Sequence, residues 1–417
     1  MTQPTPALST SSFIAQNYRF LLFGFLLMGI GNFGQTYFIA LYRMDMQIYF
    51  GLSDIGFSNL YSAMTLLSSL ALLYTGQFID KWSASRVAGL VVVALALSCL
   101  AMGFSQSLLT LAIALFMLRH FGQGLTAHTA TTAISRAYSG YRGRSLSVVQ
   151  LGYASCESVF PFMATALLVW AGWQQNWILF AGAVLLLLPI IVYLAKFEPP
   201  RDTTANTTPD TSPPEINVVF HATRKDVLRD IRFYLVLPLY LASPFFLTGM
   251  FFNNVLLAEE RGWSLNLLAT AFAFYAIVKI VLLPLSGYLI DRFQAIRVLP
   301  FAAFPLAGAF GVLLLPQDMF GTATPIIYLG LCGVHVELMT IAAGGLWVEL
   351  FGTKHLGSIR SMISMVGIFS TAAAPIVFGY VLAYFDFTIL SGAAIIYIAF
   401  AAGLAFLLPR LKVAVNR

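Results

Sequence analysis

The sequence predicts an all-α integral membrane protein with twelve transmembrane helices in two pseudo-symmetric six-helix bundles. Of its 417 residues, 59% are hydrophobic and only 10% are charged, whereas a soluble globular protein has about 25% charged residues. The apolar residues gather in blocks of about twenty, the length that crosses the hydrocarbon core as a helix. A loop signature near the end of the second block recurs half a chain later, which indicates an internal duplication.

Twelve apolar segments are long enough to span a membrane. They cover residues 18–42, 53–79, 86–104, 107–131, 145–171, 175–195, 231–258, 265–290, 295–315, 324–350, 357–384 and 388–409. The polar stretch 196–230, with five prolines among Thr, Asn and Asp, is typical of a flexible linker. We therefore expect a tail over 1–17, bundles over 18–195 and 231–409, the linker 196–230 with a short amphipathic helix near 221–230, and a tail over 410–417.

The basic residues are placed asymmetrically along the chain. All but four of the 23 lysines and arginines fall in the N-terminus, the even-numbered loops, the central linker or the C-terminus; the exceptions are Arg43, Arg119, Arg261 and Lys279. By the positive-inside rule, this places both termini in the cytoplasm. The compact loops suggest a bacterial inner membrane. The net charge of +6 thus reflects topology and does not predict a nucleic-acid partner.

The duplicated signature reads G-x-x-x-D-[K/R]-x-x-x-x-R, and each copy closes one apolar helix and opens a short basic loop. The first copy has Gly76, Asp80, Lys81 and Arg86, and the second, 211 residues later, has Gly287, Asp291, Arg292 and Arg297. A further pair of matches, Gly143 with Pro161 and Gly357 with Pro375, recurs with an offset of 214. The two halves of the chain therefore resemble each other.

These motifs resemble the major facilitator superfamily over essentially the whole chain. In that family, the charged residues after helices 2 and 8 latch the two lobes in one conformational state, which implies this role for both copies here. The family's glycine two residues after the first basic residue is replaced by Ser83 and Gln294. The alternative is that the basic residues only set the topology. The stretches 138–147 and 349–357 are most similar to the monocarboxylate and oxalate–formate porters.

Ionisable residues in the middle of apolar helices are costly, so each is a candidate functional residue. Glu157 on helix 5 is predicted to pair with Arg119 on helix 4 and to act as a proton-coupled switch; the alternative is a static buried pair. His120 could also carry protons, because histidine titrates near neutral pH. Its alternative role is a hydrogen bond to a neighbouring helix.

Three further ionisable groups lie at mid-helix depth in the second half. Lys279 has no acid one turn away on its own helix, so it needs a partner from elsewhere or an anionic substrate. Glu337 on helix 10 is the candidate partner and would make the pair a proton relay, and snorkelling of the lysine is a third option. His335, also on helix 10, is a candidate for substrate contact.

Polar faces of cavity-lining helices supply the other candidate substrate contacts. The resemblance implies that helices 1, 4, 7 and 10 line a central cavity. Arg119, Gln123 and Thr126 share one face of helix 4 at i, i+4 and i+7. The other candidates are Asn32, Gln35, Thr36 and Tyr37 on helix 1, and Thr248, Phe252 and Asn253 on helix 7. Hydrogen bonding between helices is the alternative role for these residues.

The predicted function is secondary active transport of a small organic anion, with a monocarboxylate as the suggested class, coupled to protons by alternating access. One alternative is proton-driven export of amphipathic drugs or metabolites, and another is a non-transporting receptor or assembly factor. We expect no enzyme activity, cofactor or metal, because no catalytic or cofactor motif is present. The expected partners are the substrate, protons and the lipid bilayer, with the protein as a monomer.

Overall fold

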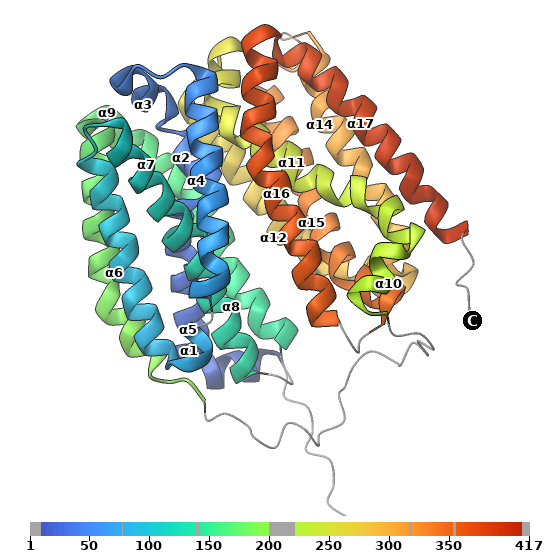
Figure 1. Ribbon diagram of the computed structural model, residues 1–417, viewed down its shortest axis with the longest axis horizontal. Coiled ribbons are helices and arrows are strands. Elements are labelled where there is room, and N and C mark those ends of the chain that lie inside the picture. The colour runs from blue at the N-terminus through green and yellow to red at the C-terminus, as the bar shows by residue number, and fades with distance from the viewer. Residues whose placement is uncertain are drawn as a thin grey trace, which may run out of the picture. The chain divides into compact units, whose positions relative to one another are not determined.

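The described part of the chain consists of helices joined by short loops in the computed structural model shown in Figure 1. The structure describes residues 10–76, 78–138, 142–199, 222–316, 319–352 and 356–410, and no strand occurs in these ranges. In a bilayer, helices satisfy every backbone hydrogen bond within one segment, so this architecture follows from the apolar composition.

The described part contains eleven helices long and apolar enough to cross a membrane. One of them, Ser145–Ala195, has 51 residues and contains Gly172 in a non-helical conformation with φ 77° and ψ 169°. This residue divides it into two spans at the place where the hydropathy pattern ends one segment at 171 and starts the next at 175. The twelve-helix prediction is therefore confirmed.

The helices of the first half of the chain include several short or irregular elements. They are α1 (Thr10–Ile30), η1 (Gly31–Gly34), α2 (Thr36–Ala40), α3 (Arg43–Phe50), α4 (Asp54–Thr75), α5 (Phe78–Lys81), α6 (Ala84–Gly103), α7 (Leu108–Met117), the π-helix η2 (Leu118–Leu125), α8 (Thr126–Ala137) and α9 (Arg142–Ala195). The predicted helices 18–42 and 107–131 are thus not continuous α-helices.

The second half combines long α-helices with several short helical elements. They are α10 (Arg224–Arg229), α11 (Ile231–Glu260), α12 (Leu265–Phe293), α13 (Ala295–Val298), η4 (Leu299–Ala302), α14 (Ala303–Leu314), η5 (Gly321–Ala323), α15 (Thr324–Phe351), α16 (Leu356–Tyr384), α17 (Phe387–Leu407) and η6 (Leu408–Arg410). The helix α10 lies where a short helix is predicted near 221–230. Thr223 and Asp226 form a capping box at its start, which stabilises so short a helix.

The helices form two compact units. Unit 1 contains Met1–Gln35, Leu67–Glu157 and Leu167–Thr211, and unit 2 contains Thr36–Leu66, Ser158–Ala166 and Ser212–Arg417. In unit 1, α1 packs on α8 and α6 on α7, and in unit 2, α12 packs on α15, α11 on α16 and α14 on α17. The units do not coincide with the predicted bundles, because α2 packs on α11 within unit 2.

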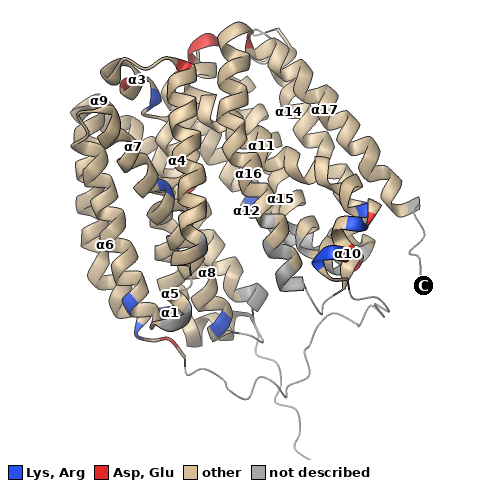
Figure 2. Cartoon of the chain, viewed as in Figure 1, with Lys and Arg blue, Asp and Glu red and all other residues tan. Residues whose placement is uncertain are grey.

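Charged residues lie mostly at the ends of the helices, and the lengths between are nearly uncharged (Figure 2). In unit 1, basic residues gather near α5 and the ends of α6 and α8, and in unit 2 they gather at α10 (Figure 2). This distribution is expected of spanning helices, because a charge at bilayer depth is costly. The few charged residues within helices are therefore the candidates for function.

Candidate functional site

Helix 1 is broken in the middle, at the border of unit 1. The α-helix α1 tightens into the 3₁₀ segment η1, and Gln35 then takes an extended conformation with φ −79° and ψ 150°. The amide of Gln35 bonds the carbonyl of Asn32 at 3.0 Å. The break removes helical partners from nearby carbonyl groups, which must then be satisfied by other residues.

The broken helix packs closely on the π-helical segment η2 of helix 4. A Cβ atom placed on Gly34 would lie 2.2 Å from the Leu118 carbonyl oxygen and 2.7 Å from the Gly122 Cα atom. The two backbones therefore touch, and only glycine permits this approach. A π-helical insertion in an α-helix often marks a functional site.

Arg119 lies in η2 and connects the two irregular segments. Its side chain is 2% exposed, and its Nη1 atom donates to the Gly34 carbonyl oxygen at 3.0 Å. The π-helix also corrects the predicted face of helix 4, because the i, i+4, i+7 spacing of Arg119, Gln123 and Thr126 assumes α-helical periodicity. Thr126 instead donates its hydroxyl to the Gly122 carbonyl.

Glu157 is buried on α9 within the same unit as Arg119. The Tyr153 hydroxyl, one turn earlier, hydrogen-bonds with the Glu157 side chain, and Arg119 lies within electrostatic range of Tyr153. We call Arg119, Tyr153 and Glu157 the coupling cluster. The structure thus brings the two ionisable residues that the sequence singles out on helices 4 and 5 into range of one tyrosine, Tyr153, which interacts with both.

Two other predicted residues, Asn32 and His120, are held by hydrogen bonds within unit 1. Asn32 is fully buried, and its Nδ2 atom donates to the carbonyls of Gly29 at 2.9 Å and Tyr153 at 3.3 Å. His120 lies 3.2 Å from both the Ser68 carbonyl oxygen and the Thr75 hydroxyl. The side chain of the half-buried Gln123 forms no hydrogen bond with the described part of the chain, so its side-chain amide is open to a ligand.

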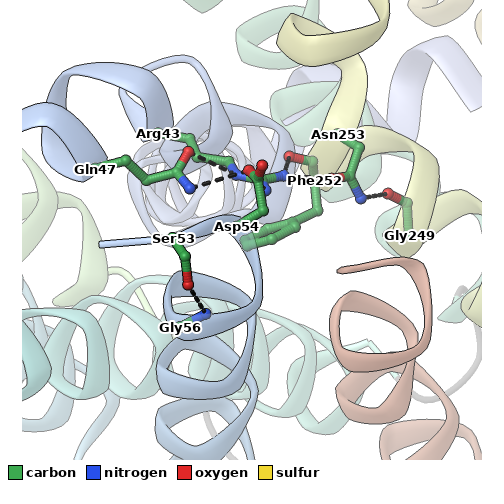
Figure 3. A network of polar contacts seen from close by, with 8 residues as sticks. All are labelled: Arg43, Gln47, Ser53, Asp54, Gly56, Gly249, Phe252 and Asn253. Atoms are coloured by element: carbon green, nitrogen blue, oxygen red, sulfur yellow. Dashed lines mark hydrogen bonds and ion pairs between the residues drawn. The ribbon is translucent and has the colours of Figure 1, made fainter. Parts of the chain in front are cut away.

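Unit 2 contains a second polar network, centred on Arg43 at the start of α3 (Figure 3). Arg43 is 1% exposed; it forms an ion pair with Asp54 and donates to Gln47 Oε1 at 3.2 Å and to the side-chain oxygen of Asn253. Its guanidinium carbon also lies 4.8 Å from the ring centre of Phe252. Burial lowers the pKa of Arg43, and the adjacent Asp54 opposes this effect.

We call Arg43, Gln47, Asp54, Phe252 and Asn253 the outer network. Two of these residues, Phe252 and Asn253, are predicted substrate contacts. The Asn253 Nδ2 atom donates to the Gly249 carbonyl at 2.7 Å, so both amide atoms of Asn253 have partners within the protein. The network joins α3 and α4, from the first half of the chain, to α11 from the second half.

The helix 1 candidates on the other side of the break belong to unit 2. The Thr36 hydroxyl accepts from the Tyr61 hydroxyl at 3.0 Å, and the Tyr37 ring lies 5.6 Å from that of Phe272. Thr248, on α11, is half-buried, and its hydroxyl forms no hydrogen bond with the described residues. Of these three, Thr248 has the side chain that is most available to a substrate.

The remaining mid-helix candidates also lie in unit 2. The Lys279 ammonium lies 4.7 Å from the ring centre of Tyr275, one turn away on α12, a geometry that stabilises a cation. His335 is fully buried, and its Nδ1 atom lies 2.7 Å from the Ala302 carbonyl. That carbonyl can only accept, so Nδ1 carries the proton. Nε2, which has no hydrogen-bond partner among the residues that the structure describes, presents a lone pair. Glu337 is buried on α15.

The loop residues predicted as a latch fall partly outside the described side chains. These are Asp80, Lys81, Gly287, Asp291 and Arg292. The structure nevertheless shows how each loop is held. Arg136 on α8 donates twice to the Ile79 carbonyl, at 2.8 and 3.0 Å, and Glu349 on α15 accepts from the amides of Ala295 and Ile296, at 2.7 and 2.9 Å.

Arg136 and Glu349, which hold the two loops, and Arg43 are not among the residues predicted from the sequence. Gly76 packs against His128, whose Nε2 atom lies 3.0 Å from the Gly76 carbonyl. Arg86 and Arg297 are exposed. The sequence contains a feature that could have selected Arg43, because it is one of two basic residues in the odd-numbered loops. Glu349 and Arg136 carried no such signal, since charges near helix ends are common.

The sequence model of the Major Facilitator Superfamily matches residues 21–343. The chain belongs to this superfamily. No curated protein sequence matches it. Among solved structures, this superfamily member is similar to a bacterial homolog of the human lysosomal transporter Spinster in two inward-facing states. The occupied form has a TM-score of 0.68 at 14% identity, with 97% of this chain and 98% of that chain covered.

The unoccupied form of the same homolog has a TM-score of 0.67 at 15% identity, and 94% of this chain and 97% of that chain are covered. At this identity, the likeness shows the fold alone. The family and the apolar helices long enough to span a membrane make this superfamily member a multi-pass membrane transporter. The fold agrees with the family. The predicted family is therefore confirmed.

Proposed function

We propose that the protein is a proton-coupled secondary transporter of a small organic anion that works by alternating access. The observation that carries the proposal is the coupling cluster: a buried carboxyl group, Glu157, is hydrogen-bonded to Tyr153 in electrostatic range of a buried Arg119. A titratable group at this depth in the membrane costs free energy, and proton transfer is a common functional reason for its presence.

Protonation of Glu157 changes the balance of charge on Arg119. With Glu157 ionised, its negative charge stabilises the guanidinium; with Glu157 protonated, Arg119 depends on the Gly34 carbonyl that it already contacts at 3.0 Å. That carbonyl belongs to the break in helix 1, where unit 1 ends. A proton on Glu157 therefore acts on the segment that connects the two units.

The anion class is supported by the cations within the helices. Arg119 and Lys279 are both placed at mid-helix depth, and the polar atoms of Gln123 and Thr248 are available to a ligand. The resemblance to monocarboxylate porters favours a monocarboxylate. The runner-up, proton-driven export of amphipathic compounds, remains the alternative because many aromatic side chains, including Tyr275 beside Lys279, could contact an apolar substrate. The topology that accompanies the proposal has both termini in the cytoplasm of a bacterial inner membrane.

Transport into proteoliposomes with an imposed pH gradient tests the proposal. Labelled small mono- and dicarboxylates and labelled amphipathic compounds would be compared on the wild type, Glu157→Gln and Lys279→Gln. We expect the wild type to accumulate a carboxylate with the gradient. Glu157→Gln should retain exchange of labelled for unlabelled substrate but lose gradient-driven accumulation, because Gln cannot carry the proton. Lys279→Gln should raise the KM about tenfold, the loss of roughly 1.4 kcal/mol of charge attraction.

The exposed Glu260→Gln at the end of α11 is the matched control and should transport like the wild type. Accumulation that persists in Glu157→Gln would contradict the coupling role. Gradient-driven transport of amphipaths alone, unchanged in Lys279→Gln, would contradict the anion class and leave the exporter as the function. The third hypothesis, a non-transporting receptor, requires that no compound is transported.

A further inference from the structure

A groove opens in unit 1 between the beginning of α6 and the end of α9. Its volume is about 670 Å³, and it is lined by Trp82, Ser85, Arg86, Gly89, Leu90 and Val192. It lies apart from the coupling cluster. The Ser85 hydroxyl donates to the Val192 carbonyl at 3.3 Å, so the two helices are tied together at its base.

The groove opens toward the lipid. On α6, Leu90 is 57% exposed and Leu97 is 52% exposed, and on α9, Leu186 is 76% exposed. Leu90 and Leu97 are seven residues apart and share one helix face. In a spanning helix, an exposed apolar stripe of this kind contacts acyl chains, since there is no water at that depth.

One end of the groove lies at the depth of the lipid headgroups. The apolar span of α6 begins at Ala84, so Arg86 lies in its first turn, and Trp82, which is exposed, comes just before the span. Tryptophan and arginine are the residues that anchor at the membrane interface. Figure 2 shows basic residues at this end of α6.

The positive charge at this end of the groove comes from Arg86. Its exposed side chain forms no hydrogen bond or ion pair with the residues that the structure describes. The backbone amide of Ala84 at the start of α6 already donates a hydrogen bond to the Glu198 carboxylate at 3.4 Å. The helix N-terminus is therefore occupied, and an anion in the groove would be held by the guanidinium.

The absence of a side chain at Gly89 keeps the groove open. A Cβ atom there would already touch Val192 at 3.4 Å, so a larger side chain would fill the space. In the second repeat, the positions equivalent to Gly89 and Leu90 are Pro300 and Phe301. Phe301 packs edge-on against Phe406 of α17, with ring centres 5.4 Å apart. The groove is thus a property of the first repeat, and aromatic packing occupies the corresponding place in the second.

We propose that this groove binds one anionic phospholipid. The phosphate group pairs with Arg86 at headgroup depth, the Trp82 indole lies at the interface, and one acyl chain lies along Gly89, Leu90 and Val192. Charge complementarity selects an anionic headgroup, and the apolar remainder of the groove selects a lipid over a soluble phosphate compound. Because Arg86 is the last residue of the signature predicted as a latch, the bound lipid also contacts the region where that signature ends.

Quenching of Trp82 fluorescence by brominated lipids tests the proposal. The full-length protein would be reconstituted in vesicles that contain phosphatidylglycerol or phosphatidylcholine with bromine on the acyl chains. The contribution of Trp82 is the difference between the wild type and Trp82→Phe. We expect quenching of Trp82 to report an affinity about fivefold higher for phosphatidylglycerol, the preference that one basic residue near the surface provides.

Arg86→Ala should abolish this preference, whereas the matched Arg297→Ala, at the equivalent and exposed position of the second repeat, should retain it. Gly89→Leu should reduce quenching of Trp82 by both lipids, because it fills the groove. Equal quenching by the two lipids in the wild type would overturn the proposal. So would an equal loss of preference in Arg297→Ala, which would indicate a diffuse surface charge, or displacement of the brominated lipid by inorganic phosphate.

Discussion

Single glycine residues decide how closely the helices of unit 1 approach each other. A Cβ atom on Gly152 would lie 2.1 Å from the Phe25 carbonyl oxygen, and one on Gly34 would lie 2.2 Å from that of Leu118. In both cases the neighbour is backbone, which cannot rotate away as a side chain can. Close approach of this kind is how helices associate in membranes, where the hydrophobic effect does not drive them together.

We therefore expect Gly34→Ala to destabilise the protein by about 1–3 kcal/mol, the cost of overpacking. It should also weaken transport, since it separates the helix 1 break from Arg119. Thermal unfolding in detergent measures the first effect. Gly182→Ala is the matched control, because no atom lies within 4 Å of its Cβ position, and it should stabilise helix α9 by about 1 kcal/mol. An equal stability of Gly34→Ala and the wild type would contradict the close contact.

At the scale of elements, the two copies of the loop signature are anchored by different chemistry. The loop before α13 is held by both carboxylate oxygens of Glu349, at 2.7 and 2.9 Å. In the equivalent loop before α6, one amide, that of Ala84, donates a longer hydrogen bond to Glu198, at 3.4 Å. A carboxylate at a helix N-terminus satisfies free amides and interacts favourably with the helix dipole. The pseudo-symmetry of the sequence therefore does not extend to these contacts.

This difference predicts unequal effects of two equivalent substitutions. Glu349→Gln should lower the stability of the protein by about 1–2 kcal/mol. The glutamine side chain has one uncharged acceptor oxygen, whereas two backbone N–H groups donate to the carboxylate in the wild type. Glu198→Gln should cost less than half of that. Thermal unfolding of both variants in the same detergent measures the difference. A larger loss in Glu198→Gln would show that the bond lengths do not report the strength of the two anchors.

At the scale of the whole molecule, the outer network connects parts of the chain that lie about 200 residues apart in sequence. Arg43 and Asn253, which it joins by a hydrogen bond, both belong to unit 2. Removing one partner of a buried charged contact leaves the other unsatisfied, which is costly in a low-dielectric interior. The network therefore stabilises the packing of α3 and α4 on α11.

A double-mutant cycle with Arg43→Gln and Asn253→Ala tests this connection. We expect a coupling energy of about 1–3 kcal/mol in thermal or chemical unfolding, as found for residues in one hydrogen-bond network. Arg43→Gln combined with Asp230→Asn, at the opposite end of α11, is the control and should be additive within about 0.5 kcal/mol. If the effects of Arg43→Gln and Asn253→Ala were also additive, other contacts would hold α3 and α4 on α11.

The candidate site was predictable in part. The spacing of charges in apolar helices selected Arg119 and Glu157, and the structure brings both into the coupling cluster with Tyr153. The polar face of helix 7 selected Asn253, whose amide is instead used by Arg43 and Gly249. One helix face can be derived from periodicity, but which partner that face meets depends on residues far away in sequence.

The sequence by itself determined the class of fold, the twelve spans and the repeated loop signature. These are local properties, because a helix must be about twenty apolar residues long to cross the hydrocarbon and must satisfy its own backbone. The tertiary structure alone decided the break in helix 1, the π-helix around Arg119, the outer network and the groove beside Arg86. Each depends on close contact between separate segments, and the free energy of such contacts is set by partners that hydropathy and spacing do not specify.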